Sequence, residues 1–361
     1  MLYFNYPKSI YNIYKKKINK QIIKVLESGN YSNNKELYNF ENKFSQYIKT
    51  KFSVGVGNAT DAIYLSLLSL GIKKNDEVIT VSHTATGTAT GIANTGAKII
   101  FSDISINDYN IDLNLLQKKI TRKTKAIVVV HLYGQSCDMN KLLNIVKKNK
   151  LFLIEDCSQA AGAFFKKKRL GSFGTLSCFS FFPTKNLSAY GDGGMICCNN
   201  KNTYNKLKAL REYGWDKKRN AKYIGINSRL DELQASILNI KLNYLDKDNK
   251  QRIKIAKRYQ KNINNRKILI SPIINNNTHV YHLFVVRCKQ QTKLINYLKK
   301  NGIFAGIHYK IPVHKQKIFL SKSKTELPVT EKIANQVVSL PIYPGLKKSE
   351  QDKVIKALNL F

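Results

Sequence analysis

Acidic residues are scarce in this sequence. Asp and Glu number 23 against 61 Lys and Arg, which gives a formal net charge of +38. So large an excess raises nucleic acid as a partner. The lysines, however, are spread over the whole chain. The densest basic runs are short and lack the interleaved aromatic residues on which single-strand binders stack bases: Lys15–Lys17, Lys166–Arg169 and Lys217–Arg219. Lysine is therefore the default surface residue, no specific nucleic acid is expected, and a basic nucleic-acid-binding protein is kept as the alternative of another class.

Paired cysteines and long apolar runs are also missing. The six cysteines include no C-x-x-C pair, which argues against a zinc site and against a disulfide framework. The apolar start of the chain is interrupted by Asn5, Pro7 and Lys8, unlike a signal peptide, and no run has the length of a membrane span. We therefore expect a soluble, cytoplasmic protein with reduced cysteines, no metal and no membrane partner.

Short apolar runs separated by helical or turn segments predict the fold. They occupy 78–82, 99–101, 126–130 and 151–154, and fully apolar strands joined by crossovers are typical of a mainly parallel sheet covered by helices on both faces. A helix from about Asp231 to about Lys261 should link this part to a smaller one. From 268 onwards the pattern becomes β-rich at 280–287 and helical at 291–301 and 348–358. We expect a large α/β domain at 1–240 and a small α+β domain at 241–361, with the Asn-rich tract 275–277 at a loop tip.

The residues that follow the predicted strands are candidates for a ligand site, because ligands of such sheets bind beyond the carboxyl ends of the strands. These residues are Ser82, His83, Asp103, His131, Glu155, Asp156 and Lys185.

Lys185 lies just past a predicted strand, Cys178–Phe182, which Pro183 ends. Phe181, Phe182, Leu187 and Tyr190 are expected to surround it. Desolvation lowers the pKa of an amine and frees it to form a Schiff base. The alternative is an ordinary surface lysine, of which this chain has many.

Two further features fit a phosphorylated heterocyclic cofactor. Asp156 follows a buried strand and can pair with a protonated ring nitrogen, although it could equally cap a helix. A helix predicted to begin after Asn58, near Thr60, offers free N–H groups to a phosphate. A dinucleotide fingerprint starting at Gly55 fails at Thr60, which argues against a nicotinamide-dependent oxidoreductase. Together, Asp156 and a Schiff base on Lys185 indicate a pyridoxal phosphate site.

Eight ordered segments along the chain resemble the DegT/DnrJ/StrS sugar-nucleotide aminotransferases, which are pyridoxal-phosphate enzymes of aminotransferase fold type I. The segments are G-V-G-N-A-T-D-A, D-E-V-I-T-V-S-H-T, V-V-H-L-Y-G-Q, I-E-D-C-S-Q-A-A-G-A, F-S-F-F-P-T-K-N-L, Y-G-D-G-G-M-I, N-S-R-L-D-E-L-Q-A and V-Y-H-L-F-V-V-R. The resemblance covers essentially the whole chain and implies a three-layer fold with a mainly parallel sheet. Lys185 argues against the family's dehydratases, in which a histidine replaces this lysine.

The resemblance also implies a role for individual residues. Lys185 would form the Schiff base, Asp156 would pair with the ring nitrogen and Gln159 would contact the ring hydroxyl. Ala59, Thr60 and Ser180 would hold the phosphate. Asn227 would reach the phosphate in the partner subunit of a homodimer with shared sites.

The chain departs from the family pattern at two places. The phosphate turn is Asn58-Ala59-Thr60, where Ser-Gly-Thr is common. Ala85 stands where many members have an aromatic ring over the cofactor, so another group, such as His83, would have to cover it.

The resemblance implies a reaction in two halves. An amino acid, L-glutamate by analogy, would donate an amino group, and a nucleotide-linked keto sugar would accept it. The C-terminal segments are most similar to members that act on dTDP-linked 3-keto-6-deoxyhexoses, with His308 and Tyr309 as substrate contacts. A member acting on a 4-keto UDP- or GDP-sugar is the alternative.

Overall fold

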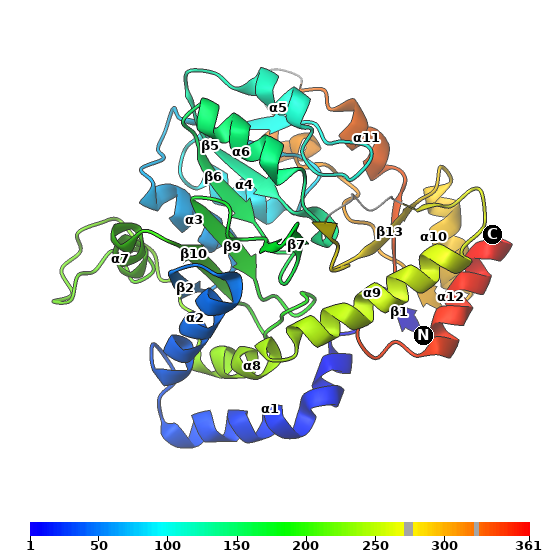
Figure 1. The fold of residues 1–361 in the computed structure, drawn as a ribbon, viewed down its shortest axis with the longest axis horizontal. Coiled ribbons are helices and arrows are strands. Elements are labelled where there is room, and N and C mark those ends of the chain that lie inside the picture. The colour runs from blue at the N-terminus through cyan, green and yellow to red at the C-terminus, as the bar shows by residue number, and fades with distance from the viewer. Residues whose placement is uncertain (271–276, 321–324) are drawn as a thin grey trace.

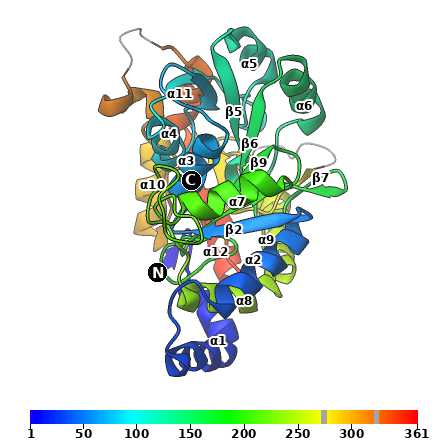
Figure 2. The same cartoon turned by 90° about the vertical axis from the view of Figure 1, so that its left-hand side faces the viewer.

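The protein is built around a seven-stranded sheet covered by helices on both faces (Figures 1 and 2). The computed structural model describes residues 1–270, 277–320 and 325–361. In spatial order the strands are β2 (Phe52–Val56), β10 (Gly194–Cys198), β9 (Leu176–Ser180), β6 (Phe152–Asp156), β5 (Thr124–Val130), β3 (Glu77–Val81) and β4 (Lys98–Ser102). Strand β10 runs antiparallel to β2 and β9, and the other neighbours are parallel. The predicted mainly parallel α/β sheet is confirmed.

Alternation along the strands separates two cores. Ile79, Ile127 and Leu153 point to one face and pack with α2, α5, α6 and α8. Val78 and Val128 point to the other face and pack with α3 and α7. The helices of this part are α1 (Lys8–Ser28), α2 (Lys35–Ile48), α3 (Ala59–Ser69), α4 (Thr86–Ala93), α5 (Leu113–Lys119), α6 (Met139–Lys148), α7 (Lys201–Leu210) and α8 (Glu232–Leu242). Because both faces are covered, the middle residues of the strands are mostly apolar.

The strand before Lys185 was predicted two residues too late. It is β9, Leu176–Ser180, and not Cys178–Phe182. The chain turns after Ser180, whose hydroxyl accepts a hydrogen bond from the Phe182 amide at 3.3 Å. Phe181 is buried in the core while Phe182 is 49% exposed. A run of apolar residues therefore continued past the end of the strand.

The C-terminal part has its own core, made of Leu2 and buried residues between Ile255 and Leu358. Strand β1 (Leu2–Tyr3) at the N-terminus pairs with β14 (Ile303–Phe304), far away in the sequence. The other elements are α9 (Leu245–Asn262), α10 (Gln291–Lys300), α11 (Pro328–Ala334) and α12 (Lys348–Leu360); strands β11 (Leu269–Ile270), β13 (Phe284–Arg287) and β15 (Val337–Leu340); a small sheet of β12 (Asn277–Thr278), β7 (Phe164–Phe165) and β8 (Lys168–Arg169); and 3-10 turns Leu132–Gly134, Val313–Lys315 and Lys317–Phe319.

The single long helix predicted at 231–261 is wrong, because the chain breaks into α8 and α9 at Asn243 and Tyr244. The Tyr244 ring stacks on Tyr14 of α1 with ring centroids 4.4 Å apart, and α9 leaves this contact toward α10 and α12 (Figure 1). The boundary at 240/241 stays a prediction. Of the Asn-rich tract, residues 275 and 276 lie outside the described residues, and Asn277 begins β12.

Within the described ranges, none of the helices combines the length and the apolar character needed to cross a membrane. All six cysteines are free and buried.

Candidate active site

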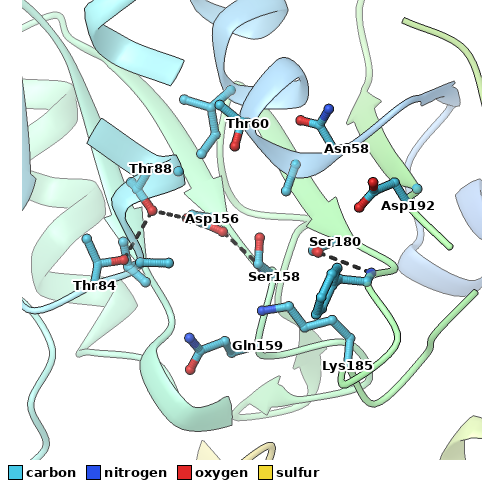
Figure 3. A pocket seen from close by; sticks show the side chains of 17 residues that line it. Asn58, Thr60, Thr84, Thr88, Asp156, Ser158, Gln159, Ser180, Lys185 and Asp192 are labelled. Carbon is cyan, nitrogen blue, oxygen red and sulfur yellow. Dashed lines mark hydrogen bonds between the residues drawn. The ribbon is translucent and has the colours of Figure 1, made fainter. Parts of the chain in front are cut away.

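A pocket of about 250 Å³ lies at the carboxyl ends of the parallel strands (Figure 3). It brings together six of the predicted site residues, namely Ala59, Thr60, Asp156, Gln159, Ser180 and Lys185. The pocket is also lined by Asn58, Ile63, Thr84, Ala85, Gly87, Thr88, Val130, Ser158, Phe182, Asp192 and Gly193.

Lys185 enters this pocket from the turn after β9 (Figure 3). Its backbone N–H donates to the Phe182 carbonyl at 2.9 Å. The next residue, Asn186, is buried and donates to Asn249 Oδ1 at 2.8 Å and to the Val280 carbonyl at 3.0 Å. Burial lowers the pKa of the Lys185 ammonium from 10.5 to about 8, and the negative charge of Asp156 opposes part of this shift. A far larger share of this amine than of an exposed lysine is therefore neutral near neutral pH, as a nucleophile requires.

The predicted surroundings of Lys185 are only partly correct. Phe182 lines the pocket. Phe181 and Leu187 belong instead to the main core below it. Tyr190 packs with α1, where its ring lies edge-on to Tyr11 with centroids 6.0 Å apart. The turn after β9 directs Phe181 and Leu187 into the core and Phe182 into the pocket, so neighbours in sequence do not all surround the lysine.

Asp156 is the last residue of β6 and is 4% exposed. One carboxylate oxygen, Oδ2, accepts a hydrogen bond from the Thr88 hydroxyl at 2.8 Å. The other, Oδ1, accepts one from the Ser158 amide at 3.1 Å. The helix-cap alternative is not realised, because the residues that follow form a turn. The Thr88 hydroxyl and the Ser158 amide thus orient the carboxylate, and Asp156 still lines the pocket.

Gln159 is buried and its amide is oriented by two partners. Its Oε1 accepts from the Tyr133 backbone N–H at 2.8 Å, and its Nε2 donates to the Tyr309 hydroxyl at 2.8 Å. Burial, and then the negative charge of Asp156, raise the pKa of the Tyr309 phenol. Tyr309 therefore stays protonated beside the pocket.

His308 lies on the same side of the site as Tyr309. Its Nδ1 is 2.9 Å from the Ser339 hydroxyl, and its carbonyl accepts from the Tyr133 hydroxyl. Burial, followed by the charge of Lys185, lowers the pKa of the His308 imidazole to about 4. It is thus neutral at physiological pH and close enough to Lys185 to sense its charge. The substrate roles of His308 and Tyr309 stay predictions.

The start of α3 forms the opposite end of the pocket. Asn58 caps this helix, since its Oδ1 accepts from the Asp61 amide at 2.8 Å. Thr60 lies in the first turn, and the Ser180 hydroxyl comes from the end of β9. Helix starts with free N–H groups attract anions, so Ala59, Thr60 and Ser180 offer the kinds of donor that hold a phosphate.

Two glycines keep this end of the pocket open. A Cβ on Gly87 would lie 2.6 Å from Thr60 Oγ1, and one on Gly194 would lie 2.5 Å from the Asn58 carbonyl carbon and oxygen. Space is therefore left against the Thr60 hydroxyl and the helix start. With an amine, a carboxylate and an anion cradle around one cavity, the residues fit pyridoxal phosphate.

Asn227 lies outside this pocket in its own chain. It lines an adjoining cavity of about 520 Å³ together with Ser228, Arg229 and Gln234, and this cavity shares Asn58 and Asp192 with the pocket. The expected reach of Asn227 into a partner subunit stays a prediction.

His83 and Ala85 were linked to the question of what covers the cofactor ring. Ala85 lines the pocket. His83 is fully buried, and its Nε2 lies 2.8 Å from the Tyr133 hydroxyl. Burial lowers the pKa of His83 to about 4. His83 is thus held by Tyr133 and is not among the residues that line the pocket, and its role as a cover for the ring stays a prediction.

Several other strand-end residues serve the fold instead. Asp103 accepts from the Val329 and Thr330 amides at 2.9 Å and so holds the start of α11. The Ser82 hydroxyl is 2.6 Å from His314 Nδ1.

Glu155 and His131 likewise support the fold, being 3.0 Å apart and fully buried. Glu155 also accepts from the amides of Gly171, Phe173 and Gly174 at 2.7–2.8 Å. The Glu155 side chain leaves β6 on the face opposite to Asp156, since alternate residues of a strand point to opposite faces, and His131, which follows β5, meets it there.

Thr84 and Thr88 are the pocket residues that sequence reasoning missed. The hydroxyl-rich segment T-A-T-G-T comes shortly after the predicted strand 78–82, and this position beyond a strand end could have indicated donors at the site. Ser158 and Asp192 lie beside predicted residues and were also not assigned.

Comparison with known proteins agrees with this geometry. Residues 12–359 match the DegT/DnrJ/EryC1/StrS aminotransferase family. The chain is 45% identical over 348 residues to a dTDP-3-amino-3,6-dideoxy-alpha-D-galactopyranose transaminase of Aneurinibacillus thermoaerophilus. The aligned residues cover 96% of this chain and 96% of that protein.

Solved structures give the same result. S. venezuelae DesV, crystallised with a ketimine intermediate, matches with a TM-score of 0.97 at 35% identity, covering 99% of this chain and 98% of that one. NtdA of Bacillus subtilis, solved with its cofactor PMP, matches with a TM-score of 0.90 at 30% identity, covering 96% of this chain and 81% of that one. These likenesses confirm the predicted aminotransferase fold and pyridoxal phosphate as the cofactor. The chain belongs to the DegT/DnrJ/EryC1/StrS aminotransferase family.

Proposed function

We propose that this aminotransferase moves an amino group from L-glutamate to the 3-keto group of a dTDP-linked 6-deoxyhexose. One observation carries the chemistry: Lys185, with its pKa lowered to about 8, shares a small pocket with Asp156 and with the start of α3. When bound, pyridoxal phosphate supplies an aldehyde that takes up amines and a ring that accepts electrons.

Each pocket residue has a proposed task. Lys185 binds the cofactor aldehyde and, once released, carries a proton to and from the substrate carbon. Asp156 holds a proton on the ring nitrogen, and Gln159 holds the ring hydroxyl. Ala59, Thr60 and Ser180 bind the phosphate through N–H and O–H donors at the start of α3. Phe182 and the neighbouring wall exclude water from the Lys185 amine.

The acceptor is proposed from the relatives. The transaminase of A. thermoaerophilus is named for a dTDP-linked 3-amino-3,6-dideoxyhexose. His308 and Tyr309 border the pocket on the side of Gln159, where a sugar would approach the Lys185 amine. As a neutral imidazole and a protonated phenol they can exchange hydrogen bonds with sugar hydroxyls. The product, an amino sugar nucleotide, is of the kind that glycosyl transfer to a polysaccharide consumes.

We also propose a homodimer in which Asn227 completes the site of the partner. Asn227 is exposed and lies beside the pocket of its own chain. The segment before it displays apolar side chains, with Ile224 90%, Tyr223 44% and Tyr213 42% exposed. Exposed apolar groups beside a polar site are typical of an interface.

Mixing two inactive variants tests the homodimer. Lys185→Ala and Asn227→Ala chains that exchange subunits would form mixed dimers with one intact site, so about a quarter of the wild-type sites should be recovered. Either variant alone should show no such recovery. If mixing restores nothing while subunit exchange is verified, Asn227 does not act across the interface.

Free, buried cysteines support the proposed place of action in the reducing cytoplasm.

The function itself is tested by the visible spectrum of the protein with pyridoxal phosphate, before and after L-glutamate. We expect a band that glutamate converts to the pyridoxamine form and that Lys185→Ala does not show. Lys74→Ala, which changes an exposed lysine that precedes β3 and so lies near the amino ends of the parallel strands, away from the pocket, is the matched control. A dTDP-linked 3-keto-6-deoxyhexose should then restore the first band, and UDP- and GDP-linked 4-keto sugars should not. Restoration by a 4-keto sugar alone would contradict the proposed acceptor.

A further inference from the structure

Two threonine hydroxyls form a chain of hydrogen bonds that ends at the Asp156 carboxylate. Thr84 precedes α4 and Thr88 lies in its first turn; both line the pocket, and both are at most 3% exposed. The Thr88 hydroxyl is 2.8 Å from Asp156 Oδ2 and 3.1 Å from the Thr84 hydroxyl (Figure 3). We refer to Thr84, Thr88 and Asp156 as the hydroxyl relay.

The direction of the relay follows from the donors. An ionised carboxylate only accepts hydrogen bonds, and a threonine hydroxyl has a single proton. Thr88 gives its proton to Asp156. The contact between the two hydroxyls therefore runs from Thr84 to Thr88. Successive hydrogen bonds in one direction polarise one another, and those to a charged acceptor are the stronger kind.

We propose that Thr88, supported by Thr84, is a positioning residue that fixes the Asp156 carboxylate for the ring nitrogen of the cofactor. This inference rests on the proposed function. Asp156 can rotate about its side-chain bonds, and the Ser158 amide, at 3.1 Å, restrains only one of its two oxygens. The Thr88 hydroxyl restrains the other, so the plane of the carboxylate is set by two donors from different elements.

The relay makes a specific electrostatic prediction. A protonated ring nitrogen disfavours a second positive charge on the Lys185 nitrogen joined to the same ring. If the carboxylate is held less well, the ring nitrogen is protonated less often, and the Lys185 nitrogen keeps its proton to higher pH. Removing the Thr88 hydroxyl should therefore move the pH midpoint of the visible band upward.

The experiment compares Thr88→Val, which keeps the shape and removes the hydroxyl, with Thr88→Ser, which keeps the hydroxyl. Thr90→Val is the matched control, because Thr90 is on the same helix and its hydroxyl bonds only the Thr86 carbonyl among the described contacts, at 3.1 Å. Each holoenzyme is titrated in the visible, and the dissociation constant of pyridoxal phosphate is measured. Thr88→Val should weaken cofactor binding severalfold, which is less than the about ten- to hundredfold that a whole hydrogen bond to a charged group is worth, because the Thr88–Asp156 bond lies within the protein and only orients the carboxylate. Thr84→Val should give a smaller change of the same sign.

The outcomes separate the two proposals. A raised midpoint and weaker binding in Thr88→Val, with Thr88→Ser near the wild type, support the relay. A Thr88→Val protein that titrates and binds like Thr90→Val overturns it, even if its melting temperature falls, since a merely structural hydroxyl would change stability alone. If Thr88→Val does not fold, Thr88→Ala is judged by the same two results. A wild-type protein with no visible band would contradict the proposed function itself.

Discussion

The lowered pKa of Lys185 predicts how the cofactor-free protein reacts with aldehydes. At pH 7, about 9% of an amine with a pKa near 8 is neutral, against about 0.03% for a pKa near 10.5, a difference of about 300-fold. We expect Lys185 to form a Schiff base far faster at neutral pH than exposed lysines do. Its rate should rise tenfold per pH unit below about 8 and level off above it.

Reductive trapping measures this profile directly. The apoprotein is mixed briefly with a small aldehyde over pH 6–11 and reduced with borohydride, and the labelled peptides are quantified by mass spectrometry. Exposed lysines in the same sample provide the internal reference. A Lys185 profile that keeps rising beyond pH 10 in parallel with theirs would refute the argument, because it would mean that burial does not destabilise the ammonium.

Asp156 gives the same prediction a second test. Its negative charge raises the pKa of Lys185 and so opposes the effect of burial. In Asp156→Asn apoprotein the Lys185 midpoint should therefore move below about 8, while retention of the cofactor becomes weaker. An upward shift would show that the carboxylate does not act on the ammonium as a nearby charge.

Three further predictions concern the scaffold. Gly194→Ala would place a Cβ 2.5 Å from the Asn58 backbone, so we expect the free energy of unfolding to fall by about 1–3 kcal/mol and the affinity for the cofactor to fall with it; unchanged affinity in a fluorescence titration would mean that the turn moves freely. Arg211→Met removes the positive partner of the buried Glu41 carboxylate and leaves it, among the described contacts, only the Gly55 amide at 2.8 Å. The free energy of unfolding should fall by about 3–5 kcal/mol, measurable in guanidinium; a loss below 1 kcal/mol would contradict this. Burial lowers the pKa of Lys241 from 10.5 to about 7 while its ammonium donates to Ser188 Oγ at 2.7 Å. Between about pH 7 and pH 10.5 the unfolded state binds more protons at Lys241 than the folded state does, so the contribution of this residue to the free energy of unfolding rises with pH. Lys241→Met should lack this rise, and equal slopes of the free energy of unfolding against pH for both proteins would count against it.

Much of the site was predictable from sequence because its residues are tied to strand ends. Lys185, Asp156 and Thr60 each follow an apolar run, and parallel strands bring their carboxyl ends to one edge. Sequence position did not reveal which strand-end residues face the pocket. Glu155 and Asp156 are adjacent, yet one holds a loop and the other faces the pocket, because neighbouring side chains of a strand point to opposite faces.

The chain's own sequence thus determined the sheet, the crossover helices and the lysine–aspartate pair, since period, apolar runs and turn residues are local signals. Tertiary packing alone decided the rest. Contacts between distant segments break the long helix at Tyr244 and join β1 to β14. Folding also places Thr88, 68 positions away in the sequence, against the carboxylate of Asp156. Such contacts depend on where crossovers return the chain, and no local pattern records that.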